Sequence, residues 1–259
     1  MDRLGDRRLP WGNAAHRASV GLTALMLACV AGCASDDKLT APTTIQSPWP
    51  EERTWAVVPF LNESGVSAVD TLTISDHFVA ELDGVDGIAC IPLNRSLAAM
   101  RALGLRAVTN DQDARAVMRT LQVDGLMVGS ITAYEPYRPL QLGVATQIYT
   151  SDTPAESVSN ADALLLPAHE SGSGAQAVAT SGPSAEYSRV YDAQNHDVLM
   201  RLQSYASGRF APKSGFREGI YLASIDAFSS FVAFDTIQEL MKEESARVAP
   251  AQASAASAQ

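Results

Sequence analysis

Residues 56–65 read AVVPFLNESG and decide the fold, because they join a buried strand to the turn that ends it. The apolar run around them is short and rich in β-branched and aromatic side chains, which predicts a buried strand. Pro59 has no backbone N–H and therefore ends the hydrogen-bond ladder. Asn62 and Ser64 can bond to the backbone of the next turn, and the glycine that follows permits a tight bend. The loop has a structural interpretation and an alternative one as a binding surface, since open α/β sheets bind ligands at the ends of their strands.

Strand and helix patterns alternate in the residues that follow. Strands are predicted at 87–92, 125–134 and 139–149, and the second of these is expected to be central, with Gly129 allowing a helix to approach closely. Apolar residues at helical spacing predict helices over 66–82 and 93–103, and a third helix that opens with a capping box at 109–112. In the last strand the apolar side chains alternate, which predicts one buried face; they are Leu140, Leu142, Val144 and Ile148, with Thr146 among them.

The composition changes in the second half of the chain. Residues 151–183 are rich in Ala, Ser and Gly without a sustained period, and are predicted to be a flexible insertion. Two strands at about 185–193 and 197–206 are predicted to form a hairpin that turns at residues 194–196. A long helix is predicted over 216–242, and the alanine-rich residues 243–259 are predicted to be a disordered tail.

A cysteine stands where an apolar run near the amino terminus turns polar. Residues 1–32 combine a positive segment, an apolar run too short to span a bilayer and small residues at its end, which is typical of an export signal. The sequence VAGC at 30–33 resembles a bacterial lipobox, in which the cysteine thiol is joined to diacylglycerol and becomes the mature amino terminus. The resemblance implies a lipid anchor on Cys33; the alternative is a plain signal peptide with an incidental cysteine. Ala34 implies sorting to the outer membrane, and the polar, proline-bearing residues 33–52 are predicted to be a flexible tether.

Three stretches resemble TolB amino-terminal-like domains, a group that includes the curli-secretion lipoprotein CsgG. AVVPFLNESG is similar to their opening AVxPFxNxSG, and LQVDGLMVGSI at 121–131 is similar to their strand LGVDALLVGSI. YDAQNHDV at 191–198 stands where these domains have a hairpin of the form YDxxTGEV, with Asn195 and His196 in place of the Thr-Gly pair. The resemblance covers about residues 53–242 and implies one α/β domain, in which helices flank a mixed five- to six-stranded sheet and the C-terminal helix is long. Its motifs are mainly strands and turns and carry no catalytic chemistry, and the resemblance implies no particular function, because one fold hosts many functions.

Charge and the remaining side chains argue against several classes of function. The net charge is −10 and becomes −12 once the four arginines and two aspartates of residues 1–32 are removed, so no nucleic-acid partner is expected. Cys90 stands in an apolar run, which predicts a buried and inert thiol. His77 beside Asp76 is interpreted as a surface residue, and no histidines are paired at metal-ligand spacing. No G-x-S-x-G, P-loop or G-x-G-x-x-G motif is present, so we predict no catalytic residue, no cofactor and no metal site.

Together these features predict a non-enzymatic outer-membrane lipoprotein that faces the periplasm and binds other envelope proteins in an assembly or export system. One alternative is an oligomeric secretion channel of the CsgG type, to which residues 139–149 could contribute a pore strand. Another alternative is a periplasmic lipoprotein that binds a small molecule. The helix at 216–242 carries more apolar surface than one sheet contact needs, which predicts either cover by the loop at 207–215 or contact with a second subunit in a homo-oligomer.

Overall fold

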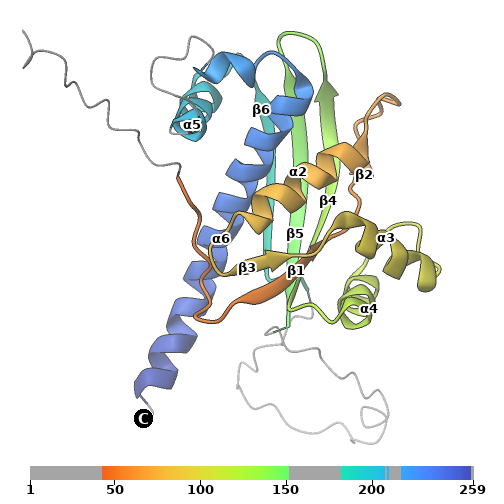
Figure 1. Ribbon diagram of the computed structural model, residues 1–259, viewed down its shortest axis with the longest axis vertical. Coiled ribbons are helices and arrows are strands. Elements are labelled where there is room, and N and C mark those ends of the chain that lie inside the picture. Colours follow the sequence, from red (N-terminus) through yellow and green to blue (C-terminus); the bar gives the residue numbers. More distant parts are fainter. Residues whose placement is uncertain (1–42, 152–181, 208, 210–216, 258–259) are drawn as a thin grey trace, which may run out of the picture. The chain divides into compact units, whose positions relative to one another are not determined.

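The fold is a mixed α/β domain built on one open sheet (Figure 1), which confirms the predicted fold class. The computed structural model describes residues 43–151, 182–207, 209 and 217–257, so the signal peptide, Cys33 and nearly all of the predicted insertion lie outside the described residues. Six strands form the sheet: β1 Arg53–Val57, β2 Leu61–Asn62, β3 Ile88–Cys90, β4 Gly125–Glu135, β5 Gln141–Thr150 and β6 Ala185–Asp192. Their order is β3-β1-β4-β5-β6, with β2 paired to β4 beyond the end of β1. The strands β1, β2, β3 and β4 are parallel, whereas β5 and β6 are antiparallel to their neighbours. The prediction that 125–134 forms a central strand is confirmed.

Helices cover the two faces of the sheet unequally. They are α2 Thr71–Asp83, α3 Leu93–Ala102, α4 Asp111–Leu121, α5 His196–Ala206 and α6 Ile225–Ser257, and a 3-10 turn, η1 Arg217–Ile220, precedes α6. On one face α2 and α6 pack against the strands, and α5 packs against α6, so that this side holds the larger core. On the other face α3 and α4 pack against β1 and β4 around a smaller core.

The broad apolar surface of α6 is covered within the chain. Phe228 is fully buried against Phe231, which in turn packs on Tyr191 of β6 and Tyr205 of α5. Because α2, α5 and the sheet all contact this helix, its apolar residues no longer indicate a second subunit. The loop at 207–215, which was the other expected cover, lies almost entirely outside the described residues.

The second strand of the predicted hairpin is wrong, because residues 197–206 form the helix α5. Asn195 caps this helix, and its side chain accepts a hydrogen bond of 2.9 Å from the backbone N–H of Asp197. Val198, Leu202 and Tyr205 are buried at helical spacing. The Asn-His pair that replaces Thr-Gly therefore starts a helix instead of turning a hairpin.

Several predicted helix ends also move. The capping residue of α4 is Asn110, not Thr109, and its side chain accepts a bond of 2.9 Å from the N–H of Asp113. The helix expected from residue 66 begins at Thr71, after the cap Asp70. The long helix begins at residue 225 instead of 216 and continues to 257, so the end predicted at 242 is wrong and the predicted disordered tail is helical over 243–257. Residues 258–259 lie outside the described residues.

Residues 43–52, which we call the N-terminal strap, pack on the domain and are not part of a flexible tether. Ile45 and Trp49 are buried in the larger core. The strap also pairs with the chain just before β3, since Ser47 N donates to Asp86 O and Asp86 N donates to Ile45 O, both at 2.9 Å. The Trp49 ring lies 5.5 Å from the Trp55 ring, centre to centre, and the Arg53 guanidinium sits 4.6 Å from the centre of the Trp49 ring. The predicted tether at 33–52 is therefore wrong for residues 43–52, and residues 33–42 lie outside the described residues.

The loop that follows β2 is ordered by its own side chains, as its sequence predicts. Ser64 donates to Asn62 Oδ1 through both its N–H (3.1 Å) and its hydroxyl (2.7 Å), and Asn62 Nδ2 donates to Val66 O at 2.8 Å. At Gly129 the close neighbour is a side chain: a Cβ there would come within 2.6 Å of the Phe60 ring, so the missing side chain makes room for this phenylalanine.

Candidate functional site

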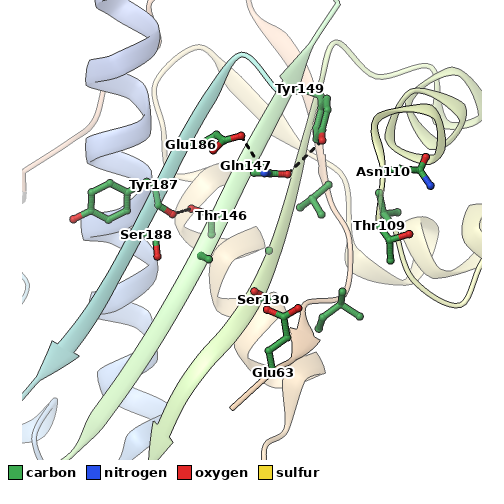
Figure 2. Close-up of a pocket in the computed structure, with 15 residues that line it drawn as sticks. Glu63, Thr109, Asn110, Ser130, Thr146, Gln147, Tyr149, Glu186, Tyr187 and Ser188 are labelled. Atoms are coloured by element: carbon green, nitrogen blue, oxygen red, sulfur yellow. Dashed lines mark hydrogen bonds between the residues drawn. The ribbon is translucent and has the colours of Figure 1, made fainter. Parts of the chain in front are cut away.

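A groove lies where helices leave the second face of the sheet uncovered (Figure 2). The cavity has a volume of about 500 Å³. It is lined by Leu61, Glu63, Val108, Thr109, Asn110, Val128, Gly129, Ser130, Ala145, Thr146, Gln147, Tyr149, Glu186, Tyr187 and Ser188. We call this feature the sheet groove. Strands β4, β5 and β6 form its floor, and the start of α4 and the end of β2 form its borders.

Strand register places two rows of side chains across the floor. Ser130, Ala145 and Ser188 are direct neighbours on β4, β5 and β6, and all three are small. The next row consists of Val128, Gln147 and Glu186, in which Gln147 Nε2 donates to Glu186 Oε1 at 3.1 Å. Because the first row has no bulky side chain, the backbone of a bound segment can come close to the sheet there.

Tyr149 forms a rigid wall at one end of the groove. Its hydroxyl donates to Asp111 Oδ1 at 2.9 Å and lies 3.3 Å from Gln147 Oε1, so it ties β5 to the first turn of α4. Burial of the phenol, followed by its hydrogen bond to Asp111, raises the pKa of Tyr149 above its ordinary value. The hydroxyl therefore stays protonated and holds the wall in place.

The lining of the groove is acidic. Glu63 and Glu186 are both exposed, and the lining contains no lysine, arginine or histidine. Arg115 of α4 is near enough to Tyr149 to lower its pKa somewhat, but it does not line the groove. The groove thus presents negative charge and neutral hydrogen-bonding groups to a ligand.

A second, smaller cavity of about 280 Å³ lies between the β4–β5 turn and η1, and it is bordered by Arg138, Leu140, Gly219 and Leu222. Its one charged side chain is already engaged, because Arg138 Nε donates to Leu222 O at 3.1 Å. The sheet groove is therefore the better candidate site.

The sequence position of His77 suggests a surface residue, but in the structure its ring also contacts a second helix. Its Nε2 lies 2.9 Å from Asp226 Oδ1 and its Nδ1 lies 3.0 Å from Ser230 Oγ, so a Ser-His-Asp set joins α2 to α6. Acyl-transfer chemistry also needs backbone N–H donors at the nucleophile to stabilise an oxyanion. Ser230 lies inside α6, where its N–H is used by the helix. The set therefore clamps two helices, and no local sequence pattern could have indicated it because His77 is about 150 residues from Asp226 and Ser230.

Cys90, predicted to be buried and inert, is half-buried in the structure. Burial, with a smaller contribution from the nearby Asp83 carboxylate, raises the pKa of Cys90 to about 12. Within the described parts of the chain, no group of three His, Cys, Asp or Glu side chains could hold a metal ion. None of the described helices has the length and apolar character needed to cross a membrane.

Comparison with known proteins gives only distant similarities. No protein-family model matches the chain, and no curated protein matches it. Among solved structures, the chain is similar to the LpoB C-terminal domain from Salmonella enterica at 12% identity and a TM-score of 0.32, covering 50% of this chain and 82% of that one. It is similar to lipoprotein GNA1162 from Neisseria meningitidis at 15% identity and a TM-score of 0.35, covering 60% and 96%. For the PelC dodecamer from Paraburkholderia phytofirmans the identity is 10%, the TM-score 0.25 and the coverage 43% and 66%. Similarities at this level assign neither a family nor a function.

Proposed function

We propose that this protein is a non-enzymatic, lipid-anchored component of the bacterial envelope that binds other proteins through the sheet groove. The observation that carries the proposal is the groove itself: a concave strip of sheet that no described helix covers, with the larger core packed on the opposite face. The lipobox-like VAGC sequence and the TolB- and CsgG-like motifs support an envelope location and an assembly or export system.

The chemistry of the lining favours binding over catalysis. Ser130 and Ser188 have no histidine beside them in the lining, and neither hydroxyl forms a hydrogen bond with Glu63 or Glu186, so no serine there is paired with a base that could activate it. Tyr149, Gln147 and Glu186 are linked in hydrogen bonds that support the floor. The open sheet groove has small residues along its floor and therefore suits an extended segment of another protein.

The anchor would keep the domain close to the membrane. If Cys33 is acylated, residues 33–42 separate the lipid from the docked strap, and ten residues span at most about 35 Å. Partners would then be proteins within that distance of the membrane, which we propose is the periplasmic face of the outer membrane.

Site-specific crosslinking in intact envelopes tests this function. A photo-crosslinking amino acid at Ser188 in the groove should give discrete adducts with another protein, whereas the same group at Thr120, exposed on α4 outside the groove, should not. Cys33→Ala should abolish acylation and weaken the adducts, because the protein is no longer held near the membrane. Equal adducts from both positions, or none from Ser188, would overturn the proposal.

The volume of the groove also falls in the range of small-molecule sites, about 300–1,000 Å³. A thermal-shift screen with metabolites separates this second candidate, since a ligand that binds only the folded state raises the melting temperature. A hit whose effect is lost in Tyr149→Phe or Glu186→Gln would favour a sensor over a protein-binding module.

A further inference from the structure

Among the described residues, no strand pairs with the outer edge of β6. Ala193 N donates to Leu140 O at 2.9 Å, and Tyr187 O accepts from the Thr146 hydroxyl on β5 at 3.1 Å. Hydrogen bonding alternates along an antiparallel strand, so the odd-numbered residues of β6 pair with β5 and the even-numbered ones turn their N–H and C=O groups outward. Glu186, Ser188 and Val190 are therefore the outward residues, and their peptide groups have no hydrogen-bond partner in the described part of the chain.

The two edge strands of the sheet differ in length and in how much of the chain lies beside them. At the opposite edge β3 has only three residues, and the N-terminal strap bridges Gln46 to Asp86 beside it. The edge strand β6 has eight residues, and Val190 leaves 49% of its surface exposed. Long, open edges are usually shortened, charged or covered because they invite pairing. An uncovered edge next to the candidate groove is thus a place where pairing can serve binding.

We propose that an extended segment of a partner protein adds to the β6 edge as a further strand, with basic side chains lying over the sheet groove. This inference rests on the proposed function and names the partner segment for the same site. The side chains of Glu186, Ser188 and Val190 stand on the groove face, so three alternate residues of the added strand lie beside them.

The edge specifies a pattern for that segment. Beside Glu186 a lysine or arginine is favoured, because the groove offers carboxylates and no cation. Beside Ser188 a small residue continues the row of small side chains, and beside Val190 an aliphatic one covers the exposed apolar surface. The basic and aliphatic residues are therefore four positions apart, with the small one between them.

The charge of the chain favours such a partner over a second copy. Each copy carries a net charge of −10, so two copies repel each other. Antiparallel pairing of two β6 strands about Ser188 would set each Glu186 opposite a Val190, which satisfies neither side chain. A basic segment satisfies both the backbone edge and the acidic lining.

Peptide binding to the full chain in detergent micelles tests the inference. The probe is the fluorescent peptide TTVTSTKTT, capped at both ends, with its reverse TTKTSTVTT for the parallel orientation. We expect one of them to raise the anisotropy saturably and to protect the amides of residues 185–192 from hydrogen exchange. The same peptide with Glu in place of Lys should bind at least tenfold more weakly, and N-methylation of the alternate amides that face β6 should abolish binding.

Substitutions in the chain separate charge from backbone pairing. Glu186→Lys should reverse the preference, so that the Glu peptide binds more tightly than the Lys peptide, while the matched exposed change Glu243→Lys on α6 should leave it as it was. Ser188→Pro removes one outward N–H and should weaken both peptides. If Ser188→Pro fails to fold, Glu186→Lys and the N-methylated peptides still decide the outcome.

Three results would overturn the inference: binding indifferent to N-methylation, a peptide preference unchanged in Glu186→Lys, or a dimer in sedimentation that Ser188→Pro dissociates, which would assign the edge to a second copy. Crosslinks from Ser188 to an envelope protein alongside any of these results would leave the proposed function standing and reject the strand addition alone.

Discussion

Removing the indole of Trp49 should detach the N-terminal strap and destabilise the domain. The side chain is 6% exposed, and its ring packs on Trp55 and under the Arg53 guanidinium. Replacing a buried Trp by Ala costs about 3–5 kcal/mol when the cavity persists. In Trp49→Ala the strap can detach from the domain and regain conformational entropy, which limits the loss of stability. We therefore expect the free energy of unfolding to fall by about 2–4 kcal/mol.

Urea unfolding followed by far-UV circular dichroism measures this loss. With a denaturant slope near 2 kcal/mol per molar, the midpoint should fall by roughly 1–2 M. Glu51→Ala, an exposed position in the same strap, is the control and should shift the midpoint by less than about 0.3 M. An unchanged midpoint in Trp49→Ala, or an equal shift in Glu51→Ala, would show that the strap does not stabilise the domain.

Trp49→Phe separates ring packing from the polar atom of the indole. The Nε1–H of Trp49 is buried without a hydrogen-bond partner among the described residues, and such a group costs about 1–3 kcal/mol. Phenylalanine keeps most of the apolar contact and removes that N–H. We therefore expect Trp49→Phe to lie within about 1 kcal/mol of the parent. A loss as large as that of Trp49→Ala would contradict this account.

Three further predictions concern other parts of the domain. Gly125→Ala should cost at least about 2 kcal/mol in urea unfolding, because a Cβ there would overlap the Trp55 ring, whereas Gly104→Ala meets no neighbouring atom and should cost only about 1 kcal/mol, from the strain of its positive φ. Cys90 should react with a thiol reagent at pH 8 far more slowly than the urea-unfolded chain, since a pKa near 12 instead of 9.0 lowers its thiolate population about a thousandfold. Asp70→Ala should cost about 1 kcal/mol at pH 7 through loss of the α2 cap. The N–H of Thr73 lowers the pKa of Asp70, so this difference is present above pH 3.8 and should disappear as the pH falls through the folded pKa.

Sequence periodicity predicted most strands correctly and failed where two periods coexist. In residues 197–206, Val198, Met200 and Leu202 alternate as in a strand, while Val198, Leu202 and Tyr205 recur as in a helix. The Asn195 cap and tertiary contacts select the helix, which leaves Met200 52% exposed.

A buried carboxylate on α6 further stabilises residues 197–206 as the helix α5. Arg201 of α5 bonds to Asp235 at 3.2 Å and to Glu239 at 2.8 Å, and the Tyr191 hydroxyl donates to Asp235 at 2.9 Å. Asp235 and Glu239 each lie more than 30 residues from Arg201, so the sequence around α5 does not indicate these contacts. Tertiary contacts of this kind override a local pattern that fits both structures.

The strap escaped prediction for a related reason. Its polar residues and prolines have the composition of a linker, and only Ile45 and Trp49 are strongly apolar over 43–49. Their burial depends on the space beside β3 and the later half of α6, which is made by residues far along the chain. When composition is averaged over a window, the signal of the two anchoring side chains, Ile45 and Trp49, is lost among the polar residues, although these side chains dock the strap on the domain.

The groove, by contrast, follows from a prediction that the sequence did support. Alternation in residues 139–149 predicted one buried face, and a strand with one buried face has another that is open. Strands lie about 4.8 Å apart and a helix is about 10 Å wide, so α3 over β1 and α4 over β4 cannot also cover β5 and β6. The residues on that open side are small or polar, as Ala145, Gln147 and Ser188 show, whereas Val58, just after β1, and Leu126 of β4 are buried in the smaller core under the helices. What the alternation could not reveal is that β6 is the last described strand of the sheet, and the proposed partner segment would use this edge beside the groove for backbone and side-chain contacts together.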